Sequence, residues 1–205
     1  MAELITICLI FLGFAYYAYV QGKNQPQIDD LNYYEDPDYA VPVKKEALSE
    51  SEIREKIPNL TCVKVVRVLD GDTVIVSKAS RKQFRIRLDS IDCPEDGQPW
   101  GDIAKFGLIK LIGGQNVRLE VHGKDGHGRD LATIYVWHRD KEEWLNVNER
   151  MIILGHAWVM RAYYDHLPND RKQKLNRLEK WAKSKKIGLW KHPNPIPPWQ
   201  WRHGE

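Results

Sequence analysis

Residues 61–88, TCVKVVRVLDGDTVIVSKASRKQFRIRL, decide the fold. Apolar and polar side chains alternate through three short runs, which is the two-residue period of a β-strand with one buried face. The positions expected to be buried are Val63, Val65 or Val66, Val68, Val74, Val76, Phe84, Ile86 and Leu88. An Asp-Gly pair at residues 70–71 separates the first two runs and supplies the positive φ angles of a tight hairpin turn. The stretch therefore predicts an antiparallel β-meander.

Two further strands and three helices are expected after the meander. Residues 117–121 alternate cleanly, and residues 131–137 form a second run after a glycine-rich connection. Helical patterns cover residues 101–112, 147–154 and 170–186, and the second has a capping box at Asn146 and Glu149 and a terminal Gly155. These elements predict a β-rich α+β domain, a five-stranded barrel of the OB type with about three helices. The open face of such a barrel commonly binds oligonucleotides.

Charge is divided unevenly along the 205 residues. The formal net charge is +3, made up of −1 in residues 1–20, −4 in residues 21–60 and +8 in residues 61–205. A cationic domain attracts polyanions such as nucleic acid, although many basic surfaces only keep a protein soluble. The 42% hydrophobic and 29% charged composition fits one globular domain and excludes a disordered or fibrous chain.

The first 22 residues predict a transmembrane anchor or an uncleaved signal sequence. Residues 4–20, LITICLIFLGFAYYAYV, carry no charge and lie at the short end of the lengths that span a bilayer. A cleaved signal peptide has a positive amino-terminal region and small residues at its cleavage site, whereas here Glu3 precedes the run and Tyr19 and Val20 end it. A single-pass membrane protein with its domain outside the cytosol is favoured, and secretion after cleavage is the alternative. Residues 23–60 are acidic, polar and proline-containing, which predicts a linker.

Three motifs contain the residues that could bind a metal or act in catalysis. Asp72 lies in LDGDT, and Arg129 lies in DGHGRDLA, residues 125–132; Arg87, Asp92 and Glu95 lie in RIRLDSIDCPE, residues 85–95. Taken singly, LDGDT is a hairpin turn, RIRLDSIDCPE fits surface ion pairing and DGHGRDLA fits a tight turn. Together they offer two aspartates for a hard divalent cation, a glutamate for proton transfer and two arginines for phosphate. Phosphodiester hydrolysis requires that combination.

In this order, D-G-D-T, R-x-R-L-x-x-I-D-x-P-E and D-x-x-G-R-x-L-A resemble the signature of the staphylococcal nuclease family. The resemblance continues through QPWGDIA at residues 98–104, Val147-Asn-Glu149, Gly155-His-Ala157 and Gly188-Leu-Trp190. It covers residues 61–191, which are expected to form the nuclease domain.

The resemblance implies an OB-type barrel and Ca²⁺-dependent cleavage of DNA or RNA with little sequence specificity. A monomer without a small-molecule cofactor is expected. The implied metal ligands are Asp72, Asp92 and the backbone carbonyl of Cys93. Arg87 and Arg129 match the phosphate-binding arginines, and Glu95 matches the general base.

This sequence departs from the secreted staphylococcal enzyme where two tyrosines of that enzyme hold the nucleotide. His127 and Arg161 align with those tyrosines. Tyr163 could supply an aromatic platform for the substrate, although tyrosines at the ends of elements more often pack in the core or at its rim. The rival to an enzyme is a catalytically inactive binding or scaffold module; the presence of all five candidate side chains favours the enzyme.

The cysteines and the carboxyl-terminal tail each allow two interpretations. Cys62 and Cys93 could pair in an oxidising compartment. Residues 192–205 form a tail rich in proline and tryptophan, in which regular structure is not expected because proline lacks an amide donor. Trp199 and Trp201 are expected to pack onto the domain, with a partner-binding motif as the alternative.

Overall fold

The computed structural model describes residues 55–204. The predicted anchor, residues 1–22, and all but the end of the predicted linker lie outside the described residues. Within the described range, no helix has the length and apolar composition needed to cross a bilayer.

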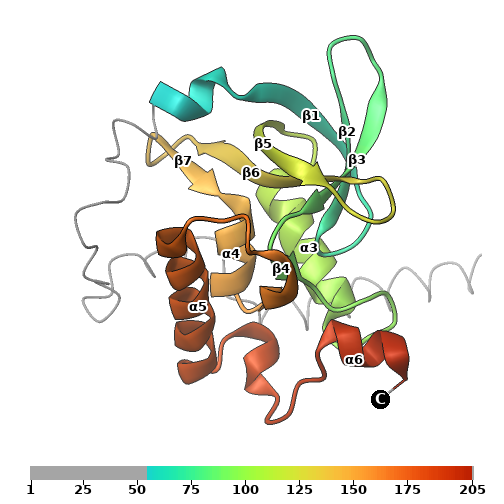
Figure 1. Ribbon diagram of the computed structural model, residues 1–205, viewed down its shortest axis with the longest axis vertical. Coiled ribbons are helices and arrows are strands. Elements are labelled where there is room, and N and C mark those ends of the chain that lie inside the picture. The colour runs from blue at the N-terminus through green and yellow to red at the C-terminus, as the bar shows by residue number, and fades with distance from the viewer. Residues whose placement is uncertain (1–54, 205) are drawn as a thin grey trace, which may run out of the picture. The chain divides into compact units, whose positions relative to one another are not determined.

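A barrel of five strands forms the centre of the domain (Figure 1). Its strands are β1 (Thr61–Val68), β2 (Thr73–Ser77), β3 (Gln83–Leu88), β5 (Asn116–Lys124) and β6 (Asp130–His138). They are ordered β3-β2-β1-β5-β6, and the parallel pairing of β3 with β6 closes the ring. The closed barrel is consistent with the predicted OB fold. Three short strands are added: β7 (Glu143–Asn146) beside β6, and the pair β4 (Ile91–Asp92) and β8 (Trp158–Val159).

An irregularity in β1 explains why the alternation there was ambiguous. The pairing with β2 shifts between Val65, opposite Val76, and Arg67, opposite Ile75. An extra residue in one strand bends it and leaves one side chain outside the alternation. Val65 is 1% exposed and Val66 is 47% exposed, so Val65 is the core residue.

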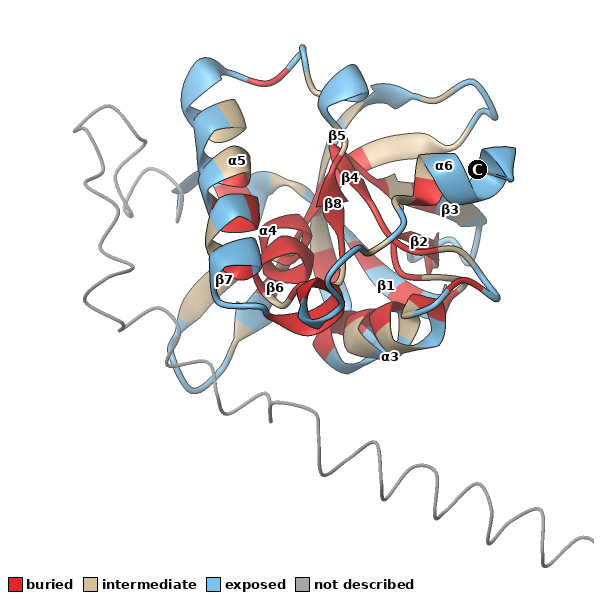
Figure 2. Ribbon diagram, turned by 90° about the horizontal axis from the view of Figure 1, so that it is seen from below, coloured by how far each residue is buried: buried red, intermediate tan, exposed pale blue. Residues whose placement is uncertain are grey.

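Three helices cover the barrel, at nearly the predicted positions. They are α3 (Gly101–Ile112), α4 (Val147–Ile153) and α5 (Asn169–Ser184). Every residue of α4 is buried (Figure 2), and the side chain of Asn146 accepts the backbone N–H of Glu149, as expected of its N-cap. Gly155, with φ of +63°, follows its end. Short 3₁₀ helices occur at η3 (Ile57–Asn59), η4 (Arg161–Tyr163) and η5 (Gly188–Lys191).

The tail contains a helix, α6 (Pro198–His203), so the prediction of no regular structure was wrong. Pro198 occupies the first turn, where a helix needs no amide donor, and proline is favoured there for that reason. Trp199 packs edge-on against buried Trp158 with ring centroids 6.4 Å apart, as predicted. Trp201 is 38% exposed and is not part of the cluster of described residues around Trp158.

Candidate active site

The turn between β1 and β2 lies directly against the segment that follows β4. A Cβ atom on Gly71 would stand 2.6 Å from the Cβ of Cys93, so a side chain at position 71 would force the two segments apart. The backbone N–H of Cys93 donates to Oδ2 of Asp72 at 2.7 Å, and its thiol donates to the carbonyl of Gly71 at 3.2 Å. These contacts bring the first and second motifs together.

Arg87 lies between two buried carboxylates. On β3, Ile86 and Leu88 point into the core, and Arg87, between them in sequence, takes the other face. Its Nη2 is 3.0 Å from Oδ2 of Asp72 and 2.8 Å from Oδ1 of Asp92. The side chains of the two aspartates are only 8% and 2% exposed. One guanidinium therefore compensates two carboxylates that would be costly to bury alone.

Burial changes the proton affinity of this cluster. It raises the pKa of Asp72 to about 8; Arg87 opposes the rise, and the charges of Asp70 and Asp92 add to it. Burial by itself would lower the pKa of Arg87, but the two aspartates raise it, so the guanidinium stays charged. Burial also raises the pKa of the Cys93 thiol well above its usual range. Cys93 is therefore a neutral thiol at neutral pH, and neither Cys93 nor exposed Cys62 forms a disulfide among the described residues.

Glu95 lies in the turn between β4 and α3, and main-chain contacts hold it there. Its N–H donates to Oε1 of Gln98 at 2.9 Å, and its carbonyl accepts the N–H of Gln98 at 3.0 Å. A Cβ on Gly101 would lie 2.1 Å from that same carbonyl oxygen, so α3 can begin this close only with glycine. The carboxylate itself is 37% exposed, which leaves it accessible to water.

Arg202 of α6 also enters the site, and the sequence analysis missed it. Its Nη2 is 2.8 Å from Oδ2 of Asp92, and its Nη1 contacts Oδ1 of Asp92 and Oε1 of Glu95. No motif includes this arginine, which follows Asp92 by 110 positions. The one sequence signal is a cationic residue one turn after two consecutive prolines, and that signal is too common to identify a site residue.

Arg129 directly precedes β6, the strand that pairs with β3, which carries Arg87. Leu131 of β6 is opposite Arg87 in the parallel pairing, and Arg129 precedes it by two positions. Within the described residues the ion-pair partner of Arg129 is Asp125, at 2.6 Å, rather than a site carboxylate. Asp125 also accepts the N–H groups of His127 and Arg129, which shapes the loop between β5 and β6. The structure thus brings Asp72, Arg87 and Asp92 into contact and leaves Arg129 paired within its own loop.

The two candidate substrate-binding residues are both open to solvent. His127 is exposed in the loop between β5 and β6, and Tyr163 in η4 is 67% exposed. Arg161 has a structural partner instead, because its guanidinium lies 2.7 Å from the buried carboxylate of Glu179. An aromatic ring is thus accessible at position 163, where it could stack on a base.

Comparison of the sequence with known proteins identifies its family and its relatives. A family model described as "Staphylococcal nuclease homologue" matches residues 85–192, more than half of the chain. The chain belongs to the staphylococcal nuclease family. An "uncharacterized endonuclease" of Escherichia coli O157:H7 is 39% identical over 140 residues, which cover 68% of this chain and 84% of that protein. A "micrococcal nuclease" of Shigella flexneri is 37% identical over 141 residues, covering 67% of this chain and 78% of that protein.

Some other relatives in the staphylococcal nuclease family are larger proteins. A "probable staphylococcal-like nuclease CAN3" of Oryza sativa subsp. japonica is 36% identical over 124 residues, which are 60% of this chain and 30% of that protein. The family match includes Arg87, Asp92, Glu95 and Arg129. It ends at residue 192, before α6, so Arg202 reaches the site from outside the matched region.

Proposed function

We propose that the protein is a metal-dependent nuclease that hydrolyses phosphodiester bonds of DNA or RNA with little sequence specificity. One observation carries the proposal: Arg87 is held between Asp72 and Asp92, with the accessible carboxylate of Glu95 joined to the same cluster. The names of the bacterial relatives, endonuclease and micrococcal nuclease, support the same activity.

The residues present fit a calcium ion. Oxygens of Asp72 and Asp92 both lie within 3.0 Å of one nitrogen of Arg87, so the two carboxylates converge on a small volume. The main chain of Cys93 is fixed beside Asp72 by its N–H contact. Carboxylate and backbone carbonyl oxygens are the donors that Ca²⁺ prefers. Asp72, Asp92 and the carbonyl of Cys93 would hold the ion, which when bound supplies positive charge to offset that of the phosphate oxygens.

The remaining side chains fit the other requirements of the reaction. Arg87 presents a planar fork that can bind two oxygens of a phosphate. Glu95 is accessible and carries a carboxylate that can accept the proton of an attacking water. Arg129, just before the neighbouring strand β6, can stabilise the charge that develops as the leaving oxygen departs, once it exchanges Asp125 for phosphate. All these groups address phosphate rather than base edges, so little sequence preference is expected.

A nuclease assay on the full-length chain tests the proposal. We expect cleavage of DNA or RNA with Ca²⁺, no cleavage after chelation, and a fall of roughly 10²–10³-fold in kcat for Arg87→Ala. Arg85→Ala is the matched control, because Arg85 is an exposed arginine on the same strand. Equal activity of the two variants would show the assignment of Arg87 to be wrong. Tight binding of nucleic acid without cleavage by any preparation would establish a binding module instead.

The proposal extends to location. Residues 1–22 would anchor the chain as a single-pass membrane protein, residues 23–60 would link it to the domain of residues 61–191, and a monomeric domain would work outside the cytosol. The uncharged run at residues 4–20 supports this arrangement. Membrane fractionation with protease accessibility tests it: a domain that is protected in intact cells contradicts the orientation, and a mature chain lacking residue 1 to about residue 20 indicates a cleaved signal.

A further inference from the structure

The end of the chain is held against the candidate site by three contacts. Pro198 is buried, and Trp199 packs on the cluster of Trp158 and Trp190. The side-chain amide of Gln98 donates to the carbonyl of Ile196 at 2.7 Å, while the oxygen of the same amide accepts the N–H of Glu95. Gln98 thus connects the approach to α6 with the turn that carries Glu95.

This docking delivers the guanidinium of Arg202 to the oxygens on which the proposed chemistry depends. Arg202 contacts both oxygens of Asp92 and one oxygen of Glu95, and Oδ1 of Asp92 also accepts from Arg87 at 2.8 Å. The side chain of Asp92 is 2% exposed, whereas that of Arg202 is 41% exposed. The arginine therefore covers the carboxylates from the solvent side.

A divalent cation and this guanidinium cannot both have full use of Asp92. The cation needs carboxylate oxygen lone pairs that Arg202 already engages, and two positive groups on one carboxylate repel each other. Resting on the proposed function, we infer that Arg202 competes with the divalent cation for Asp92 and Glu95, so that the tail sets the cation affinity of the site. Arg202 leaves the carboxylates when the cation binds, because its guanidinium is partly exposed and can turn into solvent.

The test is calorimetric titration of the full-length chain with Ca²⁺, compared between wild type and Arg202→Gln. We expect the variant to bind Ca²⁺ roughly ten-fold more tightly, within the range typical of coupled sites. Lys191→Gln is the control, since it removes the same charge from an exposed residue just before the tail and should leave the affinity unchanged. In the nuclease assay the variant should exceed wild type at limiting Ca²⁺ and equal it at saturation.

The outcomes separate this inference from the proposed function. Unchanged or weaker Ca²⁺ binding by Arg202→Gln overturns the inference, as does a lower rate at saturating Ca²⁺, which would make Arg202 a phosphate ligand. If Asp92→Asn abolishes Ca²⁺ binding and yet no preparation cleaves nucleic acid, the proposed function fails. The role of Arg202 is then decided by the ratio of the Ca²⁺ affinities of wild type and Arg202→Gln alone.

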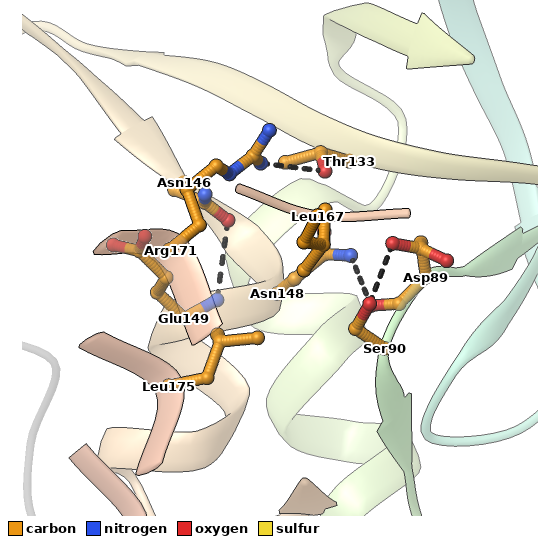
Figure 3. Close-up of a pocket in the computed structure, with 9 residues that line it drawn as sticks. All are labelled: Asp89, Ser90, Thr133, Asn146, Asn148, Glu149, Leu167, Arg171 and Leu175. Atoms are coloured by element: carbon orange, nitrogen blue, oxygen red, sulfur yellow. Dashed lines mark hydrogen bonds between the residues drawn. The ribbon is translucent and has the colours of Figure 1, made fainter. Parts of the chain in front are cut away.

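A second cluster, independent of the first, combines Asp89, His122 and His166. Asp89 directly follows β3, His122 lies in β5 and His166 lies between η4 and α5. One ligand atom from each lies within 4.8 Å of the others. Asp89 is buried, and it also lines a small polar pocket with Thr133, Asn148 and Arg171 (Figure 3). The cluster does not include Asp72, Arg87 or Asp92.

The hydrogen bonds of the cluster leave one buried carboxylate oxygen of Asp89 without a partner among the described residues. Oδ2 of Asp89 accepts from the hydroxyl of Ser90 at 2.7 Å and lies 3.0 Å from Nε2 of His166. Oδ1 of Asp89 is buried and has no hydrogen-bond partner among the residues that the structure describes. An unpaired buried carboxylate oxygen is costly and calls for a cation or a donor.

The two histidines are suited to supply the rest of a metal site. Their ring centroids lie 5.1 Å apart, and one ring nitrogen of each lies within 4.8 Å of a carboxylate oxygen of Asp89. The positive charge of nearby Arg171 is offset by Glu120, at 3.1 Å. Two imidazoles and one carboxylate form a donor set typical of transition metals rather than of Ca²⁺. We propose that Asp89, His122 and His166 bind a transition-metal dication such as Zn²⁺, which joins the segment before α5 to the barrel.

Metal analysis of the full-length chain after equilibration with Zn²⁺ tests this second proposal. We expect one equivalent of Zn²⁺ per chain, a rise in Tm on binding and loss of both in His166→Ala, whose side chain is partly exposed. His192→Ala, at an exposed histidine, and Asp92→Asn should both retain the metal. Absence of Zn²⁺ from wild type, or its retention by His166→Ala, overturns the proposal.

Discussion

The stability of the turn that carries Glu95 should depend on pH through His156. Nδ1 of His156 accepts the indole N–H of Trp100 at 3.1 Å, and Trp100 directly precedes α3. The ring packs so closely on α3 that a Cβ on Gly107 would lie 2.7 Å from it. Burial lowers the pKa of His156 to about 4. A protonated ring would lose its role as acceptor and place a charge in the interior.

The sign and size of the effect follow from the two pKa values. The unfolded chain binds a proton at about pH 6.5 and the folded chain only near pH 4, so the contribution to stability is complete above 6.5 and is lost as the pH falls toward 4. Between pH 7.5 and pH 5 the loss is about 2 kcal/mol, an upper value because the residue retains some exposure.

Urea unfolding of wild type and His156→Gln at the two pH values measures this loss. Glutamine keeps an acceptor for Trp100 and does not titrate, so the wild type should lose about 2 kcal/mol more than the variant on acidification. Other titrating groups, Asp72 among them, are common to both proteins and cancel in the difference. His192→Gln should behave as wild type. An equal pH dependence of wild type and His156→Gln would refute the reasoning.

Three further predictions concern the site and its support. Glu95→Gln should lower kcat by at least roughly 10²-fold in the nuclease assay, whereas Asp96→Asn, at the exposed neighbour, should not. Asn148→Ala should cost about 3 kcal/mol in urea unfolding, because the buried Asn148 amide bonds three backbone groups, those of Asp89, Ala132 and Ile134. Ca²⁺ affinity should fall roughly ten-fold per pH unit below about pH 8, since the raised pKa of Asp72 makes binding release a proton; calorimetry in buffers of different ionisation enthalpy measures it.

Most of the barrel could be predicted because its strands follow local rules. Ile86 and Leu88 are buried where the two-residue period places them, and the cap at Asn146 forms as its spacing implies. The choice between Val65 and Val66 could not be made, because a bulge depends on how the partner strand pairs and not on the strand itself. The tail helix could not be predicted from its prolines, because proline breaks a helix interior but is accepted in the first helical turn.

The candidate site also contains residues that could be predicted from the sequence and one that could not. Asp72, Arg87 and Asp92 could be brought together from motifs because short turns with required glycines fix their approach. The contact of Arg202 with Asp92 could not be predicted, since it depends on Trp199 finding Trp158 and on Gln98 holding Ile196. Such long-range docking leaves no periodic pattern in a single sequence.

The parallel pairing of β3 with β6 also determines when the site can exist during synthesis and folding. It joins Arg87 to Leu131, which are separated by the whole of α3 and β5, and pairings of such separation form late because a long loop must close first. Arg129 reaches the strand beside Arg87 only through this closure. In a growing or partly folded chain the site therefore lacks the second arginine, Arg129. We expect any cleavage of nucleic acid to begin only after the barrel has closed.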